Sequence, residues 1–221
     1  MTVQIQGNGG TVAEVDGTSF RAQRIVTRPI EYTTNGHYSS SAITGIIPAA
    51  LTANSEIFQF RWTASTIAII NRVRISAAVS TTMFAAGVPV QLGLYKSTGW
   101  SVAGTGGTSV AISATCKDRT TMASTAVGDF RIATTAALGA GTKTLEANPF
   151  AAIAAPGPVT GSLNGQIIAP GTVMMEANVA NGAHPMVLVA NEGFSLVSIA
   201  VPATGTWMLS IEVLWAEAAQ Y

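Results

Sequence analysis

The chain has 221 residues, of which 48% are hydrophobic and only 10% are charged, and its 11 acidic and 11 basic residues cancel at pH 7. An ordinary soluble domain has about 25% charged residues, so a free monomer would have little electrostatic repulsion to keep copies apart. We therefore expect this chain to bury surface against partners. Neutral charge and few aromatic residues also argue against a nucleic-acid-binding groove.

Three further classes are disfavoured by local sequence. Residues 1–10 have neither a basic start nor an apolar run, so we expect no signal peptide. Four prolines interrupt the uncharged stretch Ala147–Met175, so we expect no membrane helix. Cys116 is the only cysteine, which leaves no intrachain disulfide and fits a reducing cytoplasm.

In chain order, residues 1–36 are rich in Gly, Thr and Arg and are expected to form an extended N-terminal arm. Residues 37–221 are expected to form one β-sandwich domain, because apolar residues repeat every two positions and turn residues separate the runs. No amphipathic helix of three turns is predicted. The expected strands are Ala42–Ile47, Glu56–Trp62, Thr66–Ile70, Arg72–Ser76, Val88–Tyr95, Ser109–Ser113, Phe130–Ala133, Met186–Val189, Phe194–Ile199 and Trp207–Trp215.

The alternation is clearest in Glu56–Trp62 and in the last predicted strand. Phe58, Phe60 and Trp62 fall on one face of the first, and large apolar residues occupy every second position from Trp207 to Trp215. Many short strands with turn signals between them favour an antiparallel, jelly-roll-like β-sandwich. Residues 147–184 are rich in Ala, Pro and Gly, and are predicted to form a long loop that packs on another surface.

Charge is distributed unevenly along the chain. Between Arg21 and Arg119, nine basic and three acidic residues give +6. From Phe150 to Tyr221, four glutamates and no basic residue give −4. This asymmetry either helps identical subunits attract one another in a fixed orientation, or it disappears because the two halves interleave within one sandwich.

The sequence predicts no catalytic, cofactor-binding or metal site, and we expect the chain not to be an enzyme. Gly139–Thr144 superficially resembles a phosphate-binding loop, but Thr142 stands where a glycine must precede Lys143. His37 and His184 each lie beside a turn, and no local spacing supplies the ligands that a metal ion needs. The carboxylates show no close pair for acid–base catalysis, so a hydrolase on a β-sandwich ranks third among the hypotheses.

The predicted contact elements are the arm and the long loop. Arginine's planar fork suits carboxylates on a partner, although the same arginines could equally be solvated residues of a sheet face. The candidate interface residues are Arg21, Arg24, Arg28, Arg72, Arg74, Pro156, Pro158, Met174 and Met175.

Six segments together resemble virion structural proteins of tailed bacteriophages and prophages. They are Gly7–Gly10, Glu56–Trp62, Leu138–Thr144, Asn191–Phe194, Val201–Trp207 and Ile211–Glu217. The resemblance implies a head cement or decoration protein with a jelly-roll β-sandwich, which bridges capsid subunits and stabilises the head. We expect a homo-oligomer, taken to be a trimer, with the phage major capsid protein as its partner. Its location would be the virion, assembled in the host bacterial cytoplasm, without contact with a membrane.

The alternative is a tail or neck structural module, or a host-adhesion module with a carbohydrate-binding face. Sugars stack on exposed aromatic rings, so Tyr38, Trp100 or Tyr221 would have to lie outside the core. Trp100, beside the turn at Gly99, is the candidate glycan contact unless it covers the end of the sandwich.

Overall fold

The computed structural model describes residues 15–16, 22–23, 36–48, 51–112, 116–118, 122–178 and 182–219. Within these ranges the regular structure consists of β-strands, and none of the described segments is a helix able to cross a membrane. The predicted all-β class is confirmed. The predicted arm, residues 1–36, lies mostly outside the described residues; its two described pieces, β1 (Val15–Asp16) and β2 (Ala22–Gln23), pair antiparallel.

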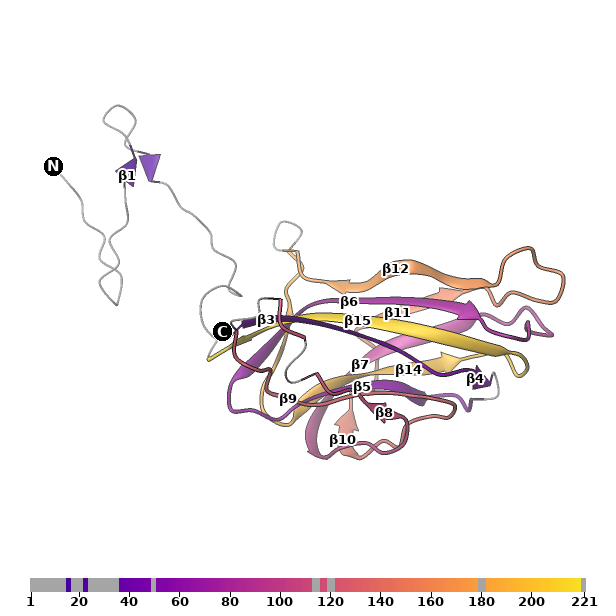
Figure 1. The fold of residues 1–221 in the computed structure, drawn as a ribbon, viewed down its shortest axis with the longest axis horizontal. Helices are drawn as coiled ribbons and strands as arrows, with labels where there is room; N and C mark the ends of the chain where they lie inside the picture. Colours follow the sequence, from indigo (N-terminus) through magenta and orange to yellow (C-terminus); the bar gives the residue numbers. More distant parts are fainter. Residues whose placement is uncertain are drawn as a thin grey trace.

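The strands from residue 36 onward form two antiparallel sheets (Figure 1). The six-stranded sheet contains β3 (Gly36–Ile43), β4 (Ile47–Pro48), β6 (Ile67–Val79), β12 (Gln166–Glu176), β13 (Met186–Leu188) and β15 (Thr206–Ala218). The seven-stranded sheet contains β5 (Ser55–Trp62), β7 (Val90–Val102), β8 (Thr108–Ser109), β9 (Val127–Ile132), β10 (Thr142–Leu145), β11 (Ala151–Ala155) and β14 (Glu192–Ala200).

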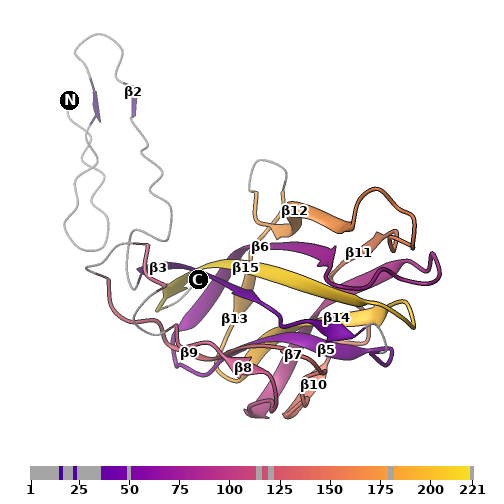
Figure 2. The same ribbon diagram turned by 45° about the vertical axis from the view of Figure 1, so that its right-hand side comes forward.

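The strand order of the six-stranded sheet is β12-β6-β15-β3, with β13 also paired to β6 and β4 also paired to β15. The order of the seven-stranded sheet is β10-β7-β14-β5-β9-β8, with β11 paired to β7. Strands that follow one another in sequence, such as β5 and β6 or β14 and β15, lie in different sheets. Figure 1 shows β12, β6 and β15 in the upper layer and β5, β9, β8 and β10 in the lower one, and Figure 2 shows the same two layers after rotation.

The core lies between the two sheets and is rich in aromatic side chains. Phe60 of β5 stacks on Phe194 of β14 with ring centroids 5.2 Å apart, and Trp215 of β15 meets Phe60 edge-on at 5.5 Å. Tyr38 of β3 stacks on the other side of this group, 5.6 Å from Trp215. All of these side chains are fully buried. The predicted alternation in Glu56–Trp62 and Trp207–Trp215 is therefore confirmed.

The predicted long loop at residues 147–184 is wrong over much of its length, because β11 and β12 lie within it. A strand requires backbone hydrogen bonds rather than large side chains, so the alanine-rich β11 forms against β7. In β12, Pro170 lacks an N–H and therefore cannot donate to a ladder. The pairing of β12 with β6 shifts register between Ile168 and Thr172, around this proline.

A predicted strand boundary is also wrong. Thr66–Ile70 and Arg72–Ser76, expected as two strands, belong to the single strand β6. Asn71 lies at the point where Ile70 pairs with Trp215 and Arg72 pairs with Leu214, so it is the extra residue of a β-bulge. The polar residue marks a local twist of the strand and not a turn.

We expect Trp215→Ala to lower the free energy of unfolding by about 3–5 kcal/mol, because it leaves a cavity between Tyr38 and Phe60. Urea denaturation followed by circular dichroism measures this difference. Leu163→Ala is the matched control, since the Leu163 side chain is fully exposed and its removal should change stability by less than about 0.5 kcal/mol. Equal losses in the two variants would contradict the assignment of Trp215 to the core.

Candidate functional site

The outer face of the seven-stranded sheet is covered by other parts of the chain. Gln59 and Ser195, which pair across β5 and β14, are both 0% exposed although their side chains point away from the core. The backbone at Gly104 lies so close that a Cβ there would overlap Gln59 Oε1. Gln59 Nε2 also donates a hydrogen bond to the Gly139 carbonyl at 3.1 Å. These contacts cover the part of the face around Gln59 and Ser195.

Trp100 belongs to this covered face, so the candidate glycan contact is wrong. Its side chain is 0% exposed, and its indole N–H donates to the Val102 carbonyl at 3.0 Å. The ring lies against Gly193, where a Cβ would leave no room for it. Tyr38, another ring considered for sugar stacking, is likewise buried in the core, and Tyr221 lies outside the described residues.

Lys143 is a buried structural cation. Its ammonium lies 2.7 Å from Glu56 Oε2 and 4.2 Å from the centre of the Trp100 ring, and the side chain is 1% exposed. Burial lowers the pKa of Lys143, while the hydrogen bond and charge of Glu56 act in the opposite direction. The ammonium is therefore held by protein groups, the Glu56 carboxylate and the Ala140 carbonyl.

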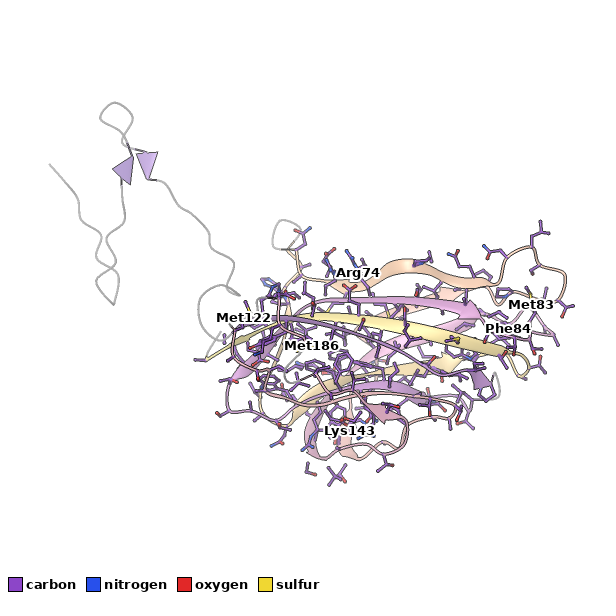
Figure 3. All side chains as sticks on the ribbon, viewed as in Figure 1. Arg74, Met83, Phe84, Met122, Lys143 and Met186 are labelled. Atoms are coloured by element: carbon purple, nitrogen blue, oxygen red, sulfur yellow. The ribbon has the colours of Figure 1, made fainter. Side chains whose placement is uncertain are left out.

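The outer face of the six-stranded sheet differs along its length. Ile67, Ile69, Ala216 and Ala218 form a small buried apolar cluster at one end, whereas the residues of the other part are at least partly exposed. These residues alternate with core residues of the same strands, such as Val73 and Ile75 of β6 or Ile211 and Val213 of β15. We call this surface the open face. It comprises Ser39, Ser41, Ile43, Arg72, Arg74, Ser76, Ala78, Val173, Glu176, Met208, Ser210, Glu212 and Leu214. Figure 3 labels Arg74 beside β12, on the side of the sandwich opposite to Lys143.

One end of the open face is an apolar groove of about 570 Å³. Ile43, 63% exposed, stands at one wall, and Ile168 and Pro170 of β12 contribute to the lining. The floor is made of small side chains, including Ser76 and Ser210, whose hydroxyls share a 2.6 Å hydrogen bond. The chemistry of the groove suits apolar protein side chains better than a charged small molecule.

The other end of the open face carries two arginines and two glutamates. Arg72 Nη2 donates to Glu212 Oε1 at 2.9 Å, and Arg72 Nη1 lies 3.8 Å from Glu176 Oε1. Arg74 pairs with Glu212 in register, yet within the described part of the chain its guanidinium has no ion pair or hydrogen bond. The Arg74 Nε–H is shielded from solvent and unsatisfied. The Arg74 side chain is partly exposed, so its terminal N–H groups, unlike Nε–H, could donate to an acceptor on a docking partner.

These ion pairs join the basic segment of the sequence to its acidic segment. Arg72 comes from the basic segment, whereas Glu176 and Glu212 come from the acidic one, and β6 lies between β12 and β15. The halves therefore interleave within one sandwich. Of the two interpretations of the charge asymmetry, the structure supports the interleaved one.

Only part of the predicted interface set lies together. Arg72 and Arg74 share the open face, but Met174 and Met175 pack against the core, since β12 turns these side chains inward. Pro156 and Pro158 lie at the end of the sandwich, where the Pro158 carbonyl accepts a hydrogen bond from the Phe84 N–H. The remaining members, Arg21, Arg24 and Arg28, lie outside the described residues. The groove could not be predicted from the sequence, because its residues come from segments distant in the chain.

A buried polar cluster at the end of β15 was also missed. Glu217 is 4% exposed and accepts hydrogen bonds from the Thr125 hydroxyl, the Ala126 N–H at 3.1 Å and the Trp215 indole at 3.2 Å. Burial raises the pKa of Glu217, and these hydrogen bonds oppose the rise. Because its donors are all protein groups, the carboxylate fixes the segment before β9 to β15 and is not exposed for catalysis. Among the described side chains, no group of three or more potential ligands could hold a metal ion.

We expect Arg72→Met and Arg74→Met to differ in their effect on stability, although both residues lie on the same strand face. Arg72→Met leaves Glu212 without its cation and should lower the free energy of unfolding by about 0.5–1 kcal/mol. Arg74→Met removes an unpartnered guanidinium and should be neutral or stabilising. Chemical denaturation of both variants measures this. An equal loss in both would show that Arg74 has an internal partner.

Cys116 should be unreactive in the folded protein. Its thiol is 6% exposed and donates to the Ile112 carbonyl at 2.8 Å, and burial raises its pKa from 9.0 to about 11. At pH 8 a maleimide should label native protein far more slowly than urea-unfolded protein. Between pH 9 and 11 the unfolded chain loses this proton first, so the free energy of unfolding should fall as pH rises through that window. Cys116→Ser should weaken this fall; rapid native labelling would contradict the burial.

We compared the chain with models of known protein families, with curated proteins and with solved structures, and none of the three comparisons found a match.

Proposed function

We propose that the chain is a non-enzymatic structural protein of a tailed-phage particle, which decorates the head and stabilises it by binding across capsid subunits. The observation that carries this proposal is the open face. Among the described residues it combines an apolar groove with an arginine whose guanidinium has no acceptor. The resemblance of six sequence segments to phage virion proteins is the reason for proposing a phage head as the assembly.

The proposal includes a jelly-roll topology for the sandwich. Eight strands support it: β3, β5, β6, β7, β11, β12, β14 and β15. One sheet then has the order β3-β15-β6-β12 and the other has β5-β14-β7-β11. This is the arrangement of eight antiparallel strands in two Greek keys. In this scheme the chain between β7 and β11 is an insertion. Its strands β9 and β8 extend the sheet beyond β5, and its segments at Gly104 and Gly139 lie over Gln59.

The mechanism follows from mass action. A protein that binds the assembled shell and not its separated subunits stabilises the shell by its binding free energy. Contacts from several copies add through their high effective concentration, so each one can be weak. On the open face, apolar side chains of the capsid would fill the groove beside Ile43, and a carboxylate or carbonyl would accept from Arg74. A host-adhesion role is not proposed, because Trp100 and Tyr38 are buried.

The test uses particles of the phage that encodes the chain, made with and without its gene. Particles that lack the protein should lose infectivity faster on heating and on osmotic shock, and purified protein added back should restore their resistance. Normal resistance without the protein, or its absence from purified particles, would overturn the proposal.

Variants of the open face sharpen this test. Arg74→Glu should reduce binding to protein-free heads about 10- to 100-fold, because it replaces the donor by a like charge facing the partner's acceptor. Val102→Lys, a charge change at an exposed position of β7 in the other sheet, is the control and should bind normally. If both variants bind equally well, the open face is not the contact surface.

A further inference from the structure

β3 forms one edge of the six-stranded sheet, and part of that edge has no neighbour among the residues that the structure describes. Its eight residues pair with β15 in an unbroken register from Gly36↔Glu217 to Ile43↔Ser210. In Figure 2 β3, drawn in indigo, is the last strand on its side of β15. A regular edge strand of this kind presents a row of backbone donors and acceptors to a further strand.

The hydrogen bonds of the first half of β3 reveal which groups point outward. Ser39 N–H donates to the Cys116 carbonyl at 2.9 Å, and Asp118 N–H donates to the His37 carbonyl at 3.1 Å. Because outward and inward residues alternate along an antiparallel strand, the N–H and C=O of Ser41 and Ile43 also point outward. These four groups have no hydrogen-bond partner in the described part of the chain. Both residues are exposed.

The open part of β3 lacks the features that normally protect a sheet edge. Such features are prolines, bulges, and charged side chains. The opposite edge strand, β12, has Pro170 and three register shifts in its pairing with β6. Ser39–Ile43 contains neither charge nor proline, and its serine and alanine side chains are small enough to let another backbone approach. The contrast within one sheet singles out β3 as the pairing edge.

We propose that β3 pairs with β3 of a second copy of this chain, antiparallel about a two-fold axis at Ala42. In this register Ser41 of each copy faces Ile43 of the other, and all four outward groups of both copies are satisfied by four hydrogen bonds. The two six-stranded sheets become one continuous sheet, and the two open faces lie side by side.

A second copy fits this edge better than a longer foreign strand. The open stretch is short, since residues 116–118 occupy the edge at His37 and Ser39 and the chain leaves the strand after Ile43. Two copies of Ser41–Ile43 can pair with each other about a two-fold axis within this short length. It also shields two exposed apolar side chains, Ile43 and Ile46, in each copy, which are 63% and 43% exposed. With no net charge, two copies have little repulsion to overcome.

The inference rests on the edge alone, so it holds or fails independently of the phage assignment. It replaces the trimer expected from sequence by a dimer, because a two-fold edge pairing is complete with two copies.

The experiment measures the mass of the full chain by light scattering across a wide range of protein concentrations. The wild type should reach twice the monomer mass. Ile43→Lys, which places a charge on the open edge, should raise the dimer dissociation constant at least tenfold. The control is Leu163→Lys, which adds the same charge at an exposed residue outside β3 and should leave the dissociation constant unchanged. Ser41→Pro is a second edge variant, because it removes an N–H that the monomer leaves unpaired.

Thermal unfolding at low concentration, where the chain is monomeric, should give similar midpoints for Ile43→Lys and Leu163→Lys, which separates loss of pairing from loss of folding. A wild type that remains monomeric at all concentrations would overturn the proposal. So would a mass of three monomers, or a dimer that both edge variants leave intact.

Discussion

The packing of the inward face of β15 against β5 and β14 is the constraint on which the rest of the structure depends. Trp215 meets Phe60 and stacks with Tyr38, so one strand joins the aromatic residues of both sheets. β15 is also central in hydrogen bonding, because β6 lies on one side of it and β3 with β4 on the other. Once its odd-numbered residues point inward, period-two geometry forces Met208, Ser210, Glu212 and Leu214 outward. The open face is thus a direct consequence of how the core is packed.

The two outer faces show different solutions to the burial of a nearly uncharged chain. On the seven-stranded sheet, segments at Gly104 and Gly139 lie over Gln59, and two cations have internal acceptors: Lys143 binds Glu56 and Arg131 binds Asp129. On the six-stranded sheet the ion pairs of Arg72 are made between neighbouring strands. Among the described residues the guanidinium of Arg74 has no acceptor. The two outer faces therefore differ in how fully their cations are satisfied.

The open face and the β3 edge would act together in such an assembly. Pairing at Ala42 joins two sheets edge to edge, so two copies of the open face would point to the same side. A shell that binds both at once gains from their effective concentration, and modest affinity at each face is sufficient. The covered face, with Trp100 and Lys143 inside it, would remain outward and inert.

The all-β class and the strands around Phe58 and Trp207 could be predicted from the amino-acid pattern, because alternation is a local property of the chain. β11 and β12 could not, since their formation depends on backbone pairing with strands far away in sequence and not on their own side chains. For the candidate site, the outward direction of Arg72 and Arg74 is local. Only the structure shows that Arg72 binds Glu212, 140 positions away, and that Arg74 has no acceptor among the described residues. The burial of Trp100 and the open edge of β3 were likewise decided by which segment lies beside each residue. Contacts between distant segments are set by the packing of the whole sandwich, which no local pattern encodes.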